Sequence, residues 1–89
     1  MMISERKVSR MVYCKLIENK GDSAVYQIGA SVDDMTGKVV FYRESKEPTL
    51  LKQADEDPVR TMHLARIVGK YSKDFVNGIF AEKLAYEIG

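Results

Sequence analysis

The sequence predicts a small α+β domain in which a three-stranded antiparallel β-meander is followed by two C-terminal helices packed on one face of the sheet. Three observations lead to this fold class. Apolar residues alternate with a period of two over about residues 7–45, turn-forming residues separate the alternating stretches, and over about 57–88 the apolar period becomes helical. Strands followed by helices are the order of elements in an α+β domain.

Length and composition indicate one domain, residues 1–89. The chain is 45% hydrophobic and 30% charged, which is ordinary for a globular domain. A domain of this size has a small core, so pairing with a second copy is a common source of further stability. The formal net charge of +1 provides no overall field that attracts nucleic acid or anionic lipid.

The sequence also bounds the cellular context. One cysteine excludes an intramolecular disulfide, which fits a reducing compartment. The sequence contains no apolar run of signal-peptide or membrane-spanning length. We therefore expect a cytoplasmic protein with no membrane partner.

The first strand is expected within Lys7–Glu18, where β-branched and apolar residues occupy alternate positions. Val12 lies on one face of this strand, which is apolar. The other face is also apolar, with Met11, Tyr13 and Ile17. Apolar residues on both faces indicate a central strand or a sheet that is covered on both sides.

The second and third strands follow from turn chemistry. Gly21 is expected to take a positive φ in the turn that leads into the second strand, Ser23–Val32. Acidic residues and Gly37 then predict a bulged hairpin, with the glycine in the left-handed conformation. The returning strand is Lys38–Ser45.

The segment 46–56 fits two interpretations, a single helical turn after Pro48 or a short edge strand. Its composition does not decide between them. Both interpretations therefore stay open at the level of the sequence.

The helical part begins with a favourable start signal, Asp57 as N-cap followed by Pro58 in the first turn. Gly69 is a candidate end for the first helix. Ser72 would then cap a second helix that runs toward Ile88. A single helix that continues through Gly69 is the alternative.

The same stretch has the spacing of a helix-turn-helix. Ala65 would allow close helix approach, Gly69 would form the turn, and Val76 would fix the angle between the helices. The alternative function is therefore a DNA-binding transcriptional regulator that uses segment 58–88. Its expected DNA contacts are Arg66, Lys70, Lys73 and Asn77.

Several features weigh against DNA recognition. The gap between Gly69 and Ser72 is one residue longer than in the commonest form, and the second helix would carry few polar groups that read bases. Phosphate neutralisation dominates duplex binding, whereas this half of the chain is almost neutral. A helical hairpin without DNA binding is the simpler interpretation.

Few groups suited to catalysis are present. Cys14 and His63 are the only cysteine and histidine, too few for a structural zinc site, and no Gly-rich phosphate loop occurs. Cys14 lies among apolar strand residues, as a buried small side chain does. We therefore expect no catalytic, cofactor-binding or metal-binding residues and no enzymatic activity.

One binding hypothesis is a stacking platform for single-stranded nucleic acid. It would combine three aromatic residues with nearby cations: Tyr13, Phe41, Tyr42, Lys7, Arg10, Lys15 and Arg43. Aromatic residues on strands are more often core or cross-strand partners, and no RNP-like consensus occurs, so this hypothesis ranks lower.

The favoured hypothesis is a small non-enzymatic protein-interaction or regulatory module. The helices suffice to cover only one side of the sheet, which leaves an apolar face for a partner. The expected interface residues are Met11, Tyr13, Ile17, Val40 and Tyr42. A second copy of the chain or another protein is the expected partner, and duplex DNA is the less favoured one.

Overall fold

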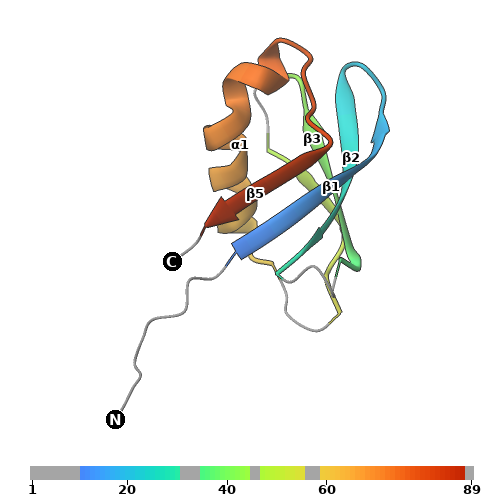
Figure 1. Cartoon of the computed structure of the whole chain (residues 1–89), viewed down its shortest axis with the longest axis vertical. Coiled ribbons are helices and arrows are strands. Elements are labelled where there is room, and N and C mark those ends of the chain that lie inside the picture. Colours follow the sequence, from blue (N-terminus) through green and yellow to red (C-terminus); the bar gives the residue numbers. More distant parts are fainter. Residues whose placement is uncertain (1–10, 31–34, 45–46, 56–58, 88–89) are drawn as a thin grey trace.

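The computed structural model describes residues 11–30, 35–44, 47–55 and 59–87. These residues form a five-stranded antiparallel sheet and one helix that lies against one side of it (Figure 1). The elements in chain order are β1 (Met11–Asn19), β2 (Ser23–Gly29), β3 (Gly37–Tyr42), β4 (Thr49–Lys52), α1 (Thr61–Val76) and β5 (Lys83–Glu87). The spatial order is β4-β3-β2-β1-β5, which makes β1 a central strand.

The fold expected from the sequence is therefore wrong in two respects. The described residues form five strands where three were expected, and one helix where two were expected. The meander of β1, β2 and β3 is present, and segment 46–56 contributes the edge strand β4. The N-cap expected at Asp57 and Pro58 lies outside the described residues, and α1 follows an extended Arg60.

The helix runs through Gly69 without a turn. Gly69 has no positive φ, and a Cβ added there would meet no atom within 4 Å. A helical glycine costs about 1 kcal/mol relative to alanine. Burial of an apolar stripe that includes Leu64, Ile67 and Phe75 offsets this cost, because each such side chain contributes about 1.5–3 kcal/mol.

The helix ends instead at Asn77 and Gly78. Gly78 has φ +76°, its N–H donates to the Phe75 carbonyl, and the Ile79 N–H reaches back to the Asp74 carbonyl at 2.8 Å. This is the Schellman arrangement, which needs a residue in the left-handed conformation just past the helix. The chain therefore leaves the helix here and cannot continue into a second one.

The expected second helix is replaced by β5, which pairs with β1. Residues four apart share one face of a helix, but they also share one face of a strand, because four is a multiple of two. Phe80, Leu84 and Ile88 stand four apart in the sequence, a spacing that fits either element; of the two that the structure describes, Leu84 lies in β5 and Phe80 precedes it. Two hydrogen bonds fix the entry to β5: Leu16 N–H to the Glu82 carbonyl, and the Tyr26 hydroxyl to the Ala81 carbonyl at 2.6 Å.

The core lies between α1 and the face of the sheet toward it, here named the inner face. The strands contribute Val12, Cys14, Ala24, Tyr26, Ile28, Val39, Phe41 and Leu84 to it. Aromatic rings join the layers, since Phe41 lies 5.5 Å from Tyr26 and 5.4 Å from Phe75, measured between ring centroids. The alternation expected in the first two strands is confirmed by this burial.

Two glycines in the sheet differ in role. Gly21 has φ +92°, the positive φ that the sequence predicted for this turn. Gly37 has no positive φ, so the expected left-handed conformation is wrong. It is needed for space, because a Cβ there would lie 2.9 Å from Ile28 Cγ1 and 3.0 Å from the backbone nitrogen of Ala54.

Side-chain hydrogen bonds fix the approach to α1 and cap the edge strand β5. Beside β4, the Gln53 amide bonds both the N–H and the carbonyl of Val59 and so fixes the approach to α1. At the other edge, the Tyr71 hydroxyl binds the carbonyl and the N–H of Ala85, and the Lys70 ammonium donates to the same carbonyl. Capping the free backbone groups of an edge strand hinders pairing with another chain.

Candidate binding face of the sheet

The outer face is the side of the sheet that points away from α1 (Figure 1). Alternation and register assign it these side chains: Met11, Tyr13, Lys15, Ile17, Glu18, Ser23, Val25, Gln27, Lys38, Val40, Tyr42, Thr49, Lys52, Lys83, Ala85 and Glu87. Each of these residues is half-buried or exposed, whereas the inner-face positions between them are mostly buried. The outer face thus combines apolar, cationic and acidic side chains at partly solvated positions.

The five residues expected at a protein interface all lie on the outer face. Tyr13, Val40, Tyr42 and Met11 are half-buried there. Ile17 is 49% exposed and lies at a bulge of β1, where the register shifts between Leu16 and Glu18. The structure thus brings the five together on one surface.

The register of the strands aligns lysines in one row across the outer face. Lys15 is opposite Lys83 on one side and Gln27 on the other, and Gln27 is opposite Lys38. The row ends on β4, where Lys52 is opposite Lys38. We name Lys83, Lys15, Gln27 and Lys38 the lysine row.

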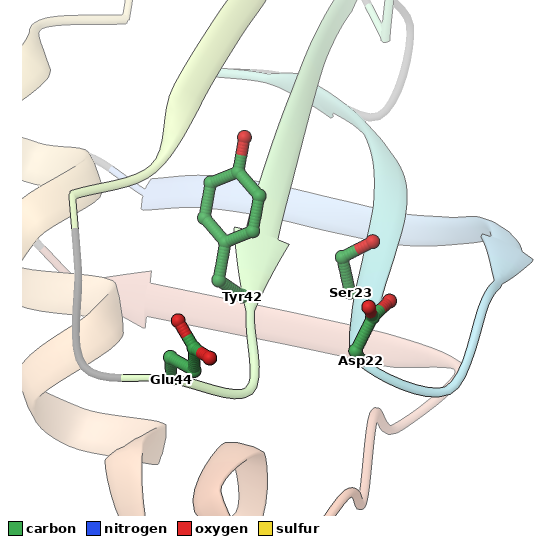
Figure 2. A pocket seen from close by; sticks show the side chains of 4 residues that line it. All are labelled: Asp22, Ser23, Tyr42 and Glu44. Atoms are coloured by element: carbon green, nitrogen blue, oxygen red, sulfur yellow. The ribbon is translucent and has the colours of Figure 1, made fainter.

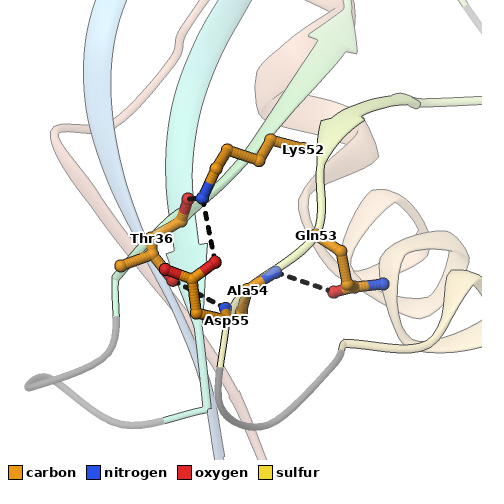
Figure 3. A network of polar contacts seen from close by, with 5 residues as sticks. All are labelled: Thr36, Lys52, Gln53, Ala54 and Asp55. Carbon is orange, nitrogen blue, oxygen red and sulfur yellow. Dashed lines mark hydrogen bonds and ion pairs between the residues drawn. The ribbon is translucent and has the colours of Figure 1, made fainter.

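Lys52 is excluded from the lysine row because its charge is already paired. Its ammonium lies 3.2 Å from the Asp55 carboxylate and donates to the Thr36 carbonyl at 3.0 Å (Figure 3). The Asp55 N–H in turn donates to the Thr36 hydroxyl. These contacts tie the end of β4 to the segment that precedes β3.

Like charges directly opposite each other destabilise a sheet. Lys15 and Lys83 face each other in this way, and both are exposed. Neighbouring strands are about 4.8 Å apart, so the row from Lys83 to Lys38 spans roughly 14 Å. An extended anion that lies along the row would relieve this repulsion.

Tyr13 stands beside the lysine row, two residues from Lys15 along β1. Its cross-strand neighbours are Gly29 and Ala85, which are among the smallest residues available. No large side chain therefore stands directly opposite Tyr13 on either neighbouring strand. Tyr13 is half-buried, so part of the side chain remains accessible to a ligand.

Tyr42, at the other end of the outer face, has acidic surroundings. Its ring rises from the end of β3 beside Ser23, with the carboxylates of Asp22 and Glu44 nearby (Figure 2). The four residues line a hollow of about 170 Å³. Its hydroxyl also shares a 2.7 Å hydrogen bond with Thr49 Oγ1. The carboxylates make this end unfavourable for an anion.

The residues expected to contact DNA do not form a helix-turn-helix. Arg66, Lys70 and Lys73 lie on the single helix, and Asn77 is its C-cap, with its side-chain amide bonded to the Lys73 carbonyl. Lys70 donates to the edge of β5. Because segment 58–88 contains no second helix among its described residues, that motif is absent from them.

The stacking platform considered from the sequence is only partly assembled. Phe41 lies in the core, and the Arg43 guanidinium donates to the Val76 carbonyl at the end of α1. Lys7 and Arg10 lie outside the described residues. Tyr13, Tyr42 and Lys15 share the outer face, as that hypothesis requires.

Sequence reasoning did not identify Gln27, Lys38 and Lys83 as neighbours. Lys83 was assigned to a helix, and a row across strands depends on their register. The signal that was available is that Lys15, Gln27 and Lys38 occupy polar positions in alternating strands. Counting back from the turns would have paired them once each turn length was known.

Comparisons with protein-family models, curated proteins and solved structures found no match to this chain. In the part of the chain that the structure describes, no helix has both the length and the apolar character needed to cross a membrane.

Proposed function

We propose that the protein is a non-catalytic binding module for a polyanion and that the outer face of the sheet is its binding surface. The observation that carries this proposal is the lysine row, in which three exposed ammonium groups line up across four adjacent strands. A net charge near zero does not oppose it, because a local cluster of one sign concentrates the field where the ligand binds.

The polar residue at the centre of the row supports the same proposal. Gln27 separates Lys15 from Lys38 and carries an amide that both donates and accepts hydrogen bonds. It adds a neutral donor between the cations. An anionic polymer that lies along the row could contact the lysine ammonium groups and the Gln27 amide in turn.

The chemistry of the buried thiol supports a role without catalysis. Burial raises the pKa of Cys14 to about 12, which keeps the thiol protonated and unreactive near neutral pH. The described residues contain no group of three or more His, Cys, Asp or Glu side chains arranged to hold a metal ion.

A direct test is fluorescence anisotropy with a labelled heparin fragment at 20–200 mM salt, roughly the range over which phosphate-type contacts weaken strongly. We expect binding that falls with salt and is lost at least tenfold in Lys15→Glu/Lys38→Glu. The matched control is Arg66→Glu/Lys73→Glu, which makes the same change of charge on α1 and should retain most of the affinity. Equal losses in the two variants would show that only overall charge matters.

Self-association through the same face is a second candidate function, favoured by the apolar residues on either side of the lysine row. Light scattering tests it: Ile17→Lys should convert a dimer to a folded monomer, and Tyr13→Lys should do the same. We rank this candidate second because two copies placed face to face would bring their lysine rows toward each other. A dimer unchanged by both substitutions would rule it out.

A further inference from the structure

We infer that the polyanion is a single-stranded nucleic acid, whose phosphates lie along the lysine row and one of whose bases stacks on Tyr13. This inference depends on the proposed function, since it names the ligand of the same surface. Proteins that bind single strands combine a cationic track with aromatic side chains on which bases stack. The outer face places both within a few residues of each other.

Tyr13 lies close to the cations of the lysine row. Tyr13 and Lys15 are two residues apart on one strand, a separation of about 6.8 Å. Across the sheet, Gly29 and Ala85 flank Tyr13, while Gln27 and Lys83 flank Lys15. A backbone that follows the row can therefore direct a base toward the ring without passing a large side chain.

Charge is distributed unevenly along the strands. The end of the outer face around Tyr42 carries the carboxylates of Asp22 and Glu44, with Glu18 exposed on β1 near the same end. The end beyond Tyr13 carries one carboxylate, that of Glu87 opposite Met11. Phosphates would be repelled most strongly at the Tyr42 end. The strand should therefore pass over the lysine row and Tyr13, and Tyr42 should take no part in binding.

An unpaired base distinguishes a single strand from other polyanions. A base in a duplex is stacked on its neighbours and cannot offer its face to Tyr13, and a heparin chain or an anionic membrane has no base at all. All of these ligands would use Lys15 and Lys38, but only an unpaired strand would also use the ring. Preference for the single strand is thus the property to measure.

The number of lysines predicts the salt dependence. For single strands, log K falls with log salt by about 0.7 per phosphate neutralised. Three ammonium groups, from Lys15, Lys38 and Lys83, give an expected slope of about −2. Lys38→Gln should reduce the slope by roughly 0.7, because one contact is lost.

The experiment compares a labelled single-stranded oligothymidine, a duplex of equal length and the heparin fragment by anisotropy at matched salt. We expect the single strand to bind most tightly. Tyr13→Leu should weaken single-strand binding at least fivefold and leave heparin binding unchanged. Tyr42→Leu is the matched control, and it should bind all three ligands as the unsubstituted protein does.

A measurement without substitution complements this comparison. Titration with oligothymidine should shift the backbone amide resonances of Tyr13, Lys15 and Gln27 more than those of α1. Single-strand binding no tighter than duplex or heparin binding, or equal losses in the two tyrosine variants, would overturn the inference and leave the proposed function standing. If none of the three ligands binds at low salt, the proposed function itself is wrong.

Discussion

The two faces of the sheet are built from the same strands and differ in almost every physical property. On β3, Val39 and Phe41 are completely buried, while Lys38 and Val40, which alternate with them, reach solvent. On β2, Tyr26 and Ile28 are buried, and Gln27 is half-buried. Adjacent residues in the chain therefore alternate between the buried core and the solvated outer face.

This contrast separates the residues that stabilise the fold from those of the proposed binding surface. Inner-face residues gain their energy from removal of apolar surface and close packing, which do not depend on a partner. The outer face holds lysines opposite each other, an arrangement that stability alone would not favour. Substitutions on the two faces should therefore affect different measurements.

The largest effect is expected for Phe41→Ala on the inner face. Phe41 is fully buried between Tyr26 and Phe75, so truncation should cost about 3–5 kcal/mol of the free energy of unfolding. Its chain neighbour Val40→Ala, on the outer face, should cost less than about 1.5 kcal/mol, since Val40 is only half-buried. Urea denaturation measures both, and similar costs would mean that the outer face is covered.

The second largest effect is expected at alkaline pH, which should lower the free energy of unfolding through groups on the inner face. Burial raises the pKa of Cys14 from 9.0 to about 12 and also raises the pKa of Tyr26. The unfolded chain loses the thiol proton above pH 9 while the folded chain keeps it, so stability is complete below pH 9 and falls as pH rises toward 12. The loss from Cys14 is at most about 1.4 kcal/mol per pH unit.

Denaturation at pH 8, 9, 10 and 11 measures this dependence. Cys14→Ala should remove the part of the dependence that begins at pH 9 and leave the part above pH 10 that comes from the raised pKa of Tyr26, although the smaller side chain also lowers stability at every pH. The native thiol should meanwhile fail to react with a thiol reagent at pH 8. Rapid modification would show that Cys14 is accessible and would contradict its burial in the core.

The edge of the sheet should respond less. Tyr71→Phe removes the hydroxyl that binds the N–H and the carbonyl of Ala85, at a cost of about 1 kcal/mol. The amide hydrogen of Ala85 should then exchange faster with solvent. Tyr42→Phe is the control, because its bond to Thr49 is exposed and water can replace it. Equal exchange at Ala85 in both variants would contradict the capping role.

The smallest effect tests the helix itself. Gly69→Ala should stabilise the protein by about 1 kcal/mol, because the site is helical and open. Gly78→Ala should destabilise it by about 1 kcal/mol, because its φ is +76°. Thermal denaturation compares the two, and a loss of stability in Gly69→Ala would mean that a turn is present at that position.

The sequence by itself determined the local features of this protein. The alternation around Val12 and Tyr26 identified the inner face, and Gly21 identified the turn between β1 and β2. Both features depend on residues that are neighbours in the chain, which is why the sequence predicts them. The apolar setting of Cys14 likewise predicted a buried thiol. The five residues expected at the interface were also placed on one face by alternation alone.

Only the tertiary structure decided which strands are neighbours. A spacing of four, such as that from Phe80 to Leu84, fits a helix and a strand equally, and pairing with β1, some seventy residues away in the chain, made Lys83–Glu87 a strand. The same pairing brought Lys83 beside Lys15 and completed the lysine row. Gly37 was likewise fixed by close packing against Ile28, because register and packing join residues that local periodicity does not relate.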